Sequence, residues 1–392
     1  MTARYPNRLK NTTPPKKPLS ILRLVRATWP RPGGKRNCVM NAINHSAAAP
    51  NMGRKDPLAR RLLKLIGAEN LSLMIALAIM VALICSQTEF FFSARNILNI
   101  GQNMAVMGLI AVGMTLVIVS AGLDISVGSI AGCASVVCAL MVSQAGTVLG
   151  GVAFGIGIGA ILGLVNATII NYLRVNPVVA TLATFSAFRG VAFLIAPGGR
   201  PVGALDPNLA WLGSGRILQI GSFPGLPVAF IILIIAAIAG HFIMTSTVFG
   251  RSIYSMGGNP AAARLAGIKL TRMRFIIYAI SGALSGLAGV IVTARTSSGQ
   301  PASGTQGLEL EAITAVFLGG ALLAGGKGTI MGTMLAVLLL ATLSNGMNLL
   351  GIPTFYQLVA KGLLLVIAVA IGQWRLARAE RRQARLAATG GN

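Results

Sequence analysis

Asp124 is the acidic side chain with the clearest chemical potential in this sequence, because it lies between two long apolar segments. Only 8 of the 392 residues are acidic, and a carboxylate beside a hydrocarbon span costs free energy unless it has a partner or a function. One interpretation is that the charge holds the ends of two spans in register through Arg174 or Lys327. The other is that Asp124 is an exposed loop acid where the next helix is capped at Ser126.

The run Gly325-Gly326-Lys327-Gly328 tests whether the chain is a nucleotide-binding enzyme. A phosphate-binding loop needs a further glycine five positions before its Gly-Lys pair, and Ser or Thr directly after the lysine. Here those positions hold Ala321 and Gly328, so the run does not match a phosphate-binding loop, and we expect the chain to have no ATP site of its own. The four cysteines and two histidines lack the spacing of a metal site, and no catalytic constellation is evident. We therefore expect a non-enzymatic chain that binds no cofactor or metal of its own.

A loop rich in helix-boundary signals lies between two apolar segments. Asn259 can cap a helix, Pro260 suits its first turn, and the alanines that follow favour a helical backbone. Gly267 can end the helix in a left-handed conformation. The sequence therefore predicts a helix of about six residues between two spans, flanked by basic side chains; the alternative is a charged surface loop.

The composition of the chain is typical of a membrane protein. It is 54% hydrophobic and 10% charged, whereas a soluble domain carries about 25% charged residues. The net charge of +25 would also fit a nucleic-acid-binding protein, but fifteen of the 33 Lys and Arg residues lie in 1–64 and five lie in 375–385. Basic ends around an apolar core are typical of cytoplasmic segments of membrane proteins, so we expect no nucleic-acid partner. The chain divides into a basic, disordered cytoplasmic extension at 1–69, a polytopic domain at 70–373 and a basic cytoplasmic tail at 374–392.

Hydropathy predicts an all-α integral membrane protein with about ten helices suited to a hydrocarbon core of about 30 Å. The expected spans lie near 70–88, 104–121, 126–143, 147–171, 177–196, 226–243, 275–294, 310–325, 328–346 and 355–373. With the N-terminus inside, 27 Lys and Arg residues fall in cytoplasmic segments and four fall outside, which places both termini in the cytoplasm. Gly155, Gly159 and Gly163 form a ridge of small residues in the fourth span, and 281–289 forms another in the seventh. Such ridges predict close helix packing.

Three blocks, in sequence order, resemble the membrane permeases of ribose-type ABC sugar importers. The first is 121–129, which is close to the family signature Gly-Gly-Ile-Asp-Leu-Ser-Val-Gly-Ser but has Ala121 in place of the first glycine. The second is the loop 249–268, with Ala261 where the family often has glutamate, and the third is the glycine-rich block 307–362. The resemblance runs with gaps from about residue 91 to 371. The signature residues that match are Asp124, Ser126, Gly128 and Ser129.

The resemblance implies that the short loop helix couples the chain to an ATPase. The residues that would make this coupling helix are Gly258, Asn259, Pro260, Ala262, Ala263, Arg264 and Gly267. The implied partners are a cytoplasmic ATP-binding cassette subunit that hydrolyses ATP with Mg²⁺, a second copy or paralogous permease, and a periplasmic solute-binding protein. The implied location is the bacterial inner membrane, and the implied function is import of a sugar or sugar-like solute. Alternatives are an ion-coupled secondary transporter, an ABC permease for a nucleoside or branched-chain amino acid, and a membrane scaffold.

A neutral polyhydroxyl solute needs hydrogen-bonding side chains and aromatic faces along its path between helices. Thr181, Thr184 and Phe185 share one face of the fifth span, and Asn166 and Asn345 are polar groups within other spans. We expect these five residues to line the translocation pathway. The alternative is that the hydroxyl groups only bond to the backbone of their own helix.

Overall fold

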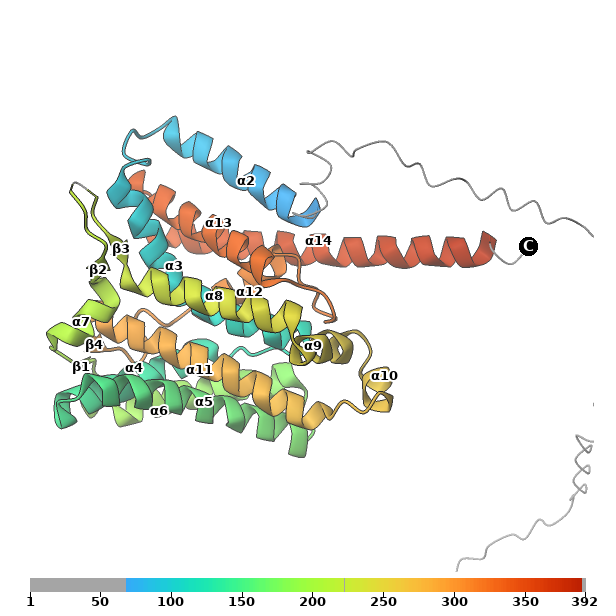
Figure 1. Ribbon diagram of the computed structural model, residues 1–392, viewed down its shortest axis with the longest axis horizontal. Helices are drawn as coiled ribbons and strands as arrows, with labels where there is room; N and C mark the ends of the chain where they lie inside the picture. Colours follow the sequence, from blue (N-terminus) through green and yellow to red (C-terminus); the bar gives the residue numbers. More distant parts are fainter. Residues whose placement is uncertain (1–67, 222, 390–392) are drawn as a thin grey trace, which may run out of the picture. The chain divides into compact units, whose positions relative to one another are not determined.

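The computed structural model describes residues 68–221 and 223–389 (Figure 1). The disordered extension expected at 1–69 therefore lies outside the described residues, apart from its last two. The described chain is almost entirely helical. Its helices are α2 (Ala68–Cys85), α3 (Ala94–Val119), α4 (Val127–Ala145), α5 (Val148–Tyr172), α6 (Pro177–Ile195), η2 (Pro197–Gly199), α7 (Pro207–Ser214), α8 (Val228–Ser246), α9 (Val248–Gly258), α10 (Pro260–Leu265), α11 (Leu270–Thr296), α12 (Leu308–Leu318), α13 (Ile330–Leu349) and α14 (Thr354–Thr389).

Two short antiparallel strand pairs join the loops at one end of the helices. β1 (Val202–Gly203) pairs with β4 (Ser298–Gly299), and β2 (Arg216–Ile217) pairs with β3 (Leu226–Pro227). Figure 1 shows these strands and α7 at the end opposite α9 and α10. The long helix α11 begins beside α10 and ends beside β4, so it extends from one end of the helices to the other.

The all-α membrane fold predicted from hydropathy is confirmed. Among the described residues, eight helices are long and apolar enough to cross a membrane: α3, α4, α5, α6, α8, α11, α13 and α14. Two of the ten expected spans therefore differ. The apolar helix near 70–88, Asn70–Cys85, is shorter than these eight and is not among them. The segment expected as a span at 310–325 is the second. There α12 has only 11 residues and ends at Leu318, because left-handed turns at Gly320, Gly325 and Gly326 interrupt the helix. Hydropathy counts such apolar residues without registering that glycine favours turns.

The glycine ridges predicted in the fourth and seventh spans bring α5 and α11 into direct backbone contact. A Cβ on Gly159 or Gly163 would fall against a backbone carbonyl of α11, and a Cβ on Gly286 would fall against the carbonyl of Gly155. Close packing of these ridges is therefore confirmed. α11 also packs against α3 and α4, so it lies at the centre of the described helices.

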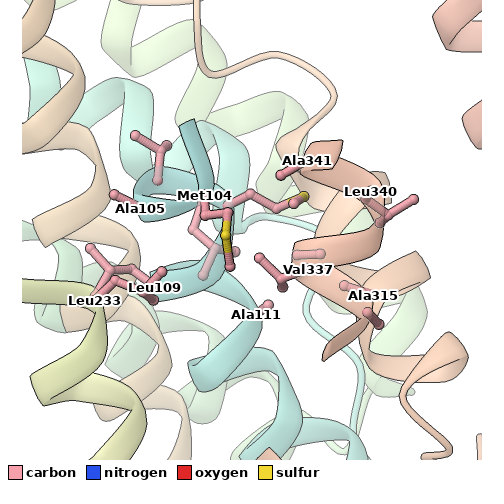
Figure 2. Close-up of a cluster of buried hydrophobic side chains, with 14 of the residues drawn as sticks. Met104, Ala105, Leu109, Ala111, Leu233, Ala315, Val337, Leu340 and Ala341 are labelled. Carbon is pink, nitrogen blue, oxygen red and sulfur yellow. The ribbon is translucent and has the colours of Figure 1, made fainter. Parts of the chain in front are cut away.

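A cluster of buried apolar side chains fills the space between α3, α8, α12 and α13 (Figure 2). In Figure 2, Leu109 of α3 lies beside Leu233, and Val337 of α13 points toward α3. The outer surfaces of α5, α6, α8 and α14 instead carry many exposed apolar residues, as expected for helices that face lipid. α14 continues without a break across the domain boundary expected at residue 374.

Candidate functional site

The connection between α3 and α4 carries Asp124 into the interior of the protein. Its side chain is 0% exposed, and Oδ1 accepts hydrogen bonds from the Ser126 backbone N–H at 3.0 Å and from the Ser126 hydroxyl at 2.6 Å. Asn166 on α5 donates to the same oxygen at 3.3 Å and to the Ser126 hydroxyl oxygen at 2.7 Å. The expectation of an exposed loop acid is therefore wrong, because neighbouring helices cover the loop. Among the described residues, the hydrogen-bond partners of Asp124 are Ser126 and Asn166, and not Arg174 or Lys327 as considered from the sequence.

Side chains from α6 and α11 hold this loop in place. Thr184 on α6 donates to Oδ1 of Asn166 at 2.7 Å, and the Tyr278 hydroxyl on α11 donates to the Leu123 carbonyl at 3.1 Å. Thr181 is also buried, but it donates at 2.8 Å to a carbonyl of its own helix. We call Asp124, Ser126, Asn166 and Thr184 the signature cluster. Its hydrogen bonds connect the loop to two helices.

One atom of the signature cluster lacks a hydrogen-bond partner among the described residues: Oδ2 of Asp124. Asp124 lies in the connection between two helices, and burial raises its pKa to about 6 because the ionised form loses its hydration. Hydrogen bonds from Ser126 and Asn166 lower the pKa and offset part of this shift. The carboxyl group therefore changes charge close to neutral pH.

A second polar centre joins α4, α6 and the start of α12, and sequence reasoning missed it. Nη1 of Arg189 donates to the carbonyl of Pro301 and to the hydroxyl of Thr305, both at 2.9 Å. Glu309, 6% exposed, lies so close to Gly128 that a Cβ there would collide with its carboxylate. This contact leaves no space for a side chain at position 128. The available signal was that Arg189 and Glu309 are charged residues inside apolar segments. Because they lie far apart in the sequence, nothing indicated that they are close in space.

The helix predicted at 260–265 is confirmed in detail. Asn259 caps α10 by accepting a hydrogen bond from the Ala262 N–H at 3.0 Å, and Gly267 has a φ of +83°. Ala263 is buried against the protein. Leu265, which sequence reasoning did not select, is 91% exposed, so it offers an apolar contact at the outer end of the helix.

Tight backbone contacts connect α9 to the end of α3. The N–H of Gly326 donates to the Val119 carbonyl at 2.8 Å, and a Cβ at Gly257 would collide with that same carbonyl. The Tyr254 hydroxyl donates to the Gly328 carbonyl at 2.8 Å, and burial raises the pKa of this phenol. We call Val119, Gly257 and Gly326 the glycine junction. It connects the element before α10 to the helix that leads into the signature cluster.

Asn345 lies apart from the other residues expected to form the pathway. It lines a cavity of about 460 Å³ near the ends of α11 and α13 that lie away from α9 and α10. Asn345 and Asn96 exchange two hydrogen bonds, at 2.8 and 3.0 Å. Phe185 instead lies 5.6 Å from the guanidinium of Arg189, measured to the ring centre. The structure therefore places the five expected pathway residues in three separate regions.

Comparison with known proteins shows the family to which this chain belongs. Residues 96–369 match the family model described as branched-chain amino acid transport system / permease component. The chain is 40% identical over 301 residues to the ribose import permease protein RbsC of Escherichia coli (strain K12), covering 76% of this chain and 92% of that protein. It is 41% identical over 296 residues to RbsC of Bacillus subtilis (strain 168), covering 75% and 90%.

A further relative is the L-arabinose ABC transporter permease protein AraH of Azospirillum brasilense, 34% identical over 287 residues, which are 73% of this chain and 82% of that protein. No solved structure matches the chain. The family match covers most of the described helices, from α3 to α14. The chain therefore belongs to the family of permease components of branched-chain amino acid transport systems.

Proposed function

We propose that this chain is the membrane-spanning permease subunit of an ATP-binding cassette importer that moves a sugar or sugar-like solute into the bacterial cytoplasm. The observation that carries the proposal is the similarity, over 73–78% of the chain, to permeases named for ribose, xylose and arabinose. A separate cytoplasmic subunit binds ATP and Mg²⁺ and hydrolyses the ATP. This chain is a transporter subunit and not an enzyme.

In this proposal, α10 and its flanking residues form the contact with the ATPase. Caps fix the helix at both ends, so it can move as a rigid unit, and Arg264 and Leu265 are exposed on it. The contact surface comprises Gly258, Asn259, Pro260, Ala262, Arg264 and Gly267, with Ala263 as the buried support. The glycine junction then transmits a displacement of α9 and α10 to the signature cluster.

The outer face of α6 supports pairing with a second copy or a paralogous permease. Ser186, Ala187 and Gly190 are exposed on this helix, and small residues at such spacing favour close helix contacts in membranes. The neighbouring Arg189 is only half-buried, and a cation that faces lipid within a span is costly. A partner permease that covers this face would remove that cost. A periplasmic binding protein delivers the solute, and both termini lie in the cytoplasm.

The test is uptake by the reconstituted importer in liposomes, with radiolabelled D-ribose, D-xylose and L-arabinose as probes. We expect uptake that needs a catalytically competent ATPase and that persists when ionophores abolish ion gradients. Uptake driven by an ion gradient without the ATPase would establish a secondary transporter instead. ATP-driven uptake of leucine but of no sugar would establish the substrate that the family description names.

A further inference from the structure

We propose that the cavity near the ends of α11 and α13 is a binding site for a neutral monosaccharide on its way through the permease. This inference rests on the proposed function and assigns a place within the chain to the solute. The cavity measures about 460 Å³, within the range of about 300–1,000 Å³ typical of small-molecule sites. We call it the polar cavity. The polar side chains that line it include Asn103, Arg295, Glu311, Ser344, Asn345 and Lys361.

An ion pair on the wall indicates that the polar cavity holds water or a polar solute. Nζ of Lys361, on α14, lies 2.7 Å from Oε1 of Glu311, on α12, and the two side chains are 18% and 24% exposed. Ionisable residues within spans almost always face the protein interior or a water-filled cavity, because contact with lipid is costly. Both residues line the cavity, so the ion pair forms part of its wall.

The donors and acceptors of the wall match the hydroxyl groups of a sugar. Each sugar hydroxyl can donate one hydrogen bond and accept others. The ammonium of Lys361 and the carboxylate of Glu311 place a donor directly beside an acceptor, so neighbouring hydroxyls of one sugar could each find a partner. Also on the wall, Nη2 of Arg295 donates to Oδ1 of Asn103 at 2.9 Å, which leaves further N–H groups of the guanidinium for the solute. Glu311 and Lys361 compensate each other's charge, and the guanidinium of Arg295 adds one further positive charge to the wall.

Part of the wall of the polar cavity is apolar and belongs to the buried core. Met107, Leu340 and Ala341 line the cavity and also belong to the buried apolar cluster between α3 and α13, and Figure 2 labels Leu340 and Ala341 on α13. A sugar in the cavity therefore meets a hydrophobic barrier on the side toward α9 and α10. Separation of α3 and α13 would open this barrier, so the site fits a state that accepts solute before ATP-driven release.

The first test exchanges the two charges of the ion pair in the reconstituted importer, with D-ribose, D-xylose and L-arabinose as probes. We expect Glu311→Gln and Lys361→Gln each to lower the rate of sugar uptake at least tenfold. In the double variant Glu311→Lys/Lys361→Glu, we expect normal membrane levels but uptake at least fivefold below the unaltered importer, because donor and acceptor have changed places. Recovery of full uptake in the double variant would show a purely structural ion pair and overturn the proposal. Arg200→Gln, an exposed residue outside the cavity, is the control.

The second test uses a cysteine inside the polar cavity, in a chain whose native Cys38, Cys85, Cys133 and Cys138 are replaced by alanine. A charged, membrane-impermeant thiol reagent should modify Ser344→Cys and reduce uptake at least fivefold. The adjacent Leu343→Cys lies in a separate and mostly apolar groove, and we expect it to remain unmodified and active. An unmodified Ser344→Cys, or full uptake after its modification, would overturn the proposal. If sugar uptake depends on ATP but is unchanged by the charge variants and by modification of Ser344→Cys, the proposed binding site is refuted and the proposed function is retained. If uptake is driven by an ion gradient, the proposed function is refuted instead.

Discussion

The signature cluster and the polar cavity show two ways in which polar side chains are accommodated among apolar helices. In the signature cluster, Asp124 and Asn166 are each 0% exposed, and short hydrogen bonds within the protein satisfy most of their polar atoms. In the polar cavity, Glu311 and Lys361 pair with each other but remain partly exposed around an open volume. The signature cluster is closed and holds helices together, whereas the polar cavity has donors and acceptors that remain free to bind a solute.

The comparison teaches that polarity alone does not locate a binding site in such a protein. The hydroxyl and amide groups of the signature cluster look equally suitable for a sugar when only the sequence is considered. Their hydrogen bonds are already used by other side chains, and an unpaired buried polar group is expensive. A solute that entered there would have to break these bonds first.

The largest effect is expected from Gly257→Val, because this substitution would disrupt the contact between α9 and the end of α3, the helix that leads into the signature cluster. Gly257 does not line the polar cavity. Any Cβ at position 257 collides with the Val119 carbonyl, whereas a Cβ at Gly258 meets open space. We expect the level of Gly257→Val in membranes to fall at least tenfold and the membrane level of Gly258→Ala to match that of the unaltered protein, because a Cβ at Gly258 meets no neighbouring atom. Quantitative immunoblots and sugar uptake would measure both. Normal levels and normal uptake for Gly257→Val would show that the glycine junction has no role.

A direct comparison of the two regions comes from Asn166→Leu and Asn345→Leu. Loss of Asn166 leaves Asp124, Ser126 and Thr184 with fewer hydrogen bonds in a buried site, which should cost about 3 kcal/mol of folding stability. Loss of Asn345 should cost about 1 kcal/mol, because its partner Asn96 keeps a hydrogen bond to a backbone carbonyl at 2.9 Å.

Thermal unfolding in detergent and uptake in liposomes would separate these effects. We expect Asn345→Leu to be stable but slow in uptake, because Asn345 borders the polar cavity. Equal destabilisation by both substitutions would remove the distinction between a closed and an open region.

The charge of Asp124 should make the stability of the protein depend on pH. Its pKa in the folded protein is about 6, above the usual 3.8, so the folded state favours the protonated form. Stability should therefore be greatest below about pH 4, fall as the pH rises to about 6, and stay level above it, with a total change of at most about 3 kcal/mol. Asp124→Asn should abolish this slope. Parallel pH profiles of the unfolding temperature for both proteins would contradict the assignment.

A similarly small effect on stability is expected from Gly267→Val at the end of α10, far from both polar regions. The φ of +83° at Gly267 costs a β-branched residue roughly 1 kcal/mol or more, while no neighbouring atom blocks the side chain. We expect normal insertion and lower uptake. Gly267→Asn, which tolerates the left-handed region better, should retain more activity. Unchanged uptake together with unchanged ATPase binding for the valine variant would argue against coupling through α10.

Local features of this fold could be predicted from the sequence, whereas long-range contacts could not. The bounds of α10 followed from Asn259, Pro260 and Gly267, because capping and left-handed turns depend on neighbouring residues. The contact between the ridges of α5 and α11 could be anticipated from the spacing of small residues. The short α12 was missed because its apolar continuation contains glycines in positive-φ turns.

The functional regions were only partly predictable for the same reason. The sequence identified Asp124 as unusual, but it gave no indication that Asn166 and Ser126, and not Arg174 or Lys327, would contact the carboxylate. The contact of Glu309 with Gly128 joins segments far apart in the chain. The polar cavity depends on five helices at once, α3, α11, α12, α13 and α14, so only Asn345 was anticipated within it.

The backbone contact between α5 and α11 limits how this protein can move. Gly155, Gly159 and Gly163 recur every four residues, and each lies against the opposing helix with no space for a methyl group. A slide by a fraction of a turn would press larger side chains into the opposing backbone. Contact could be restored only after a shift of about one helical turn, roughly 5.4 Å. α5 and α11 should therefore travel as a single rigid body through the transport cycle, and the hinges must lie elsewhere in the chain.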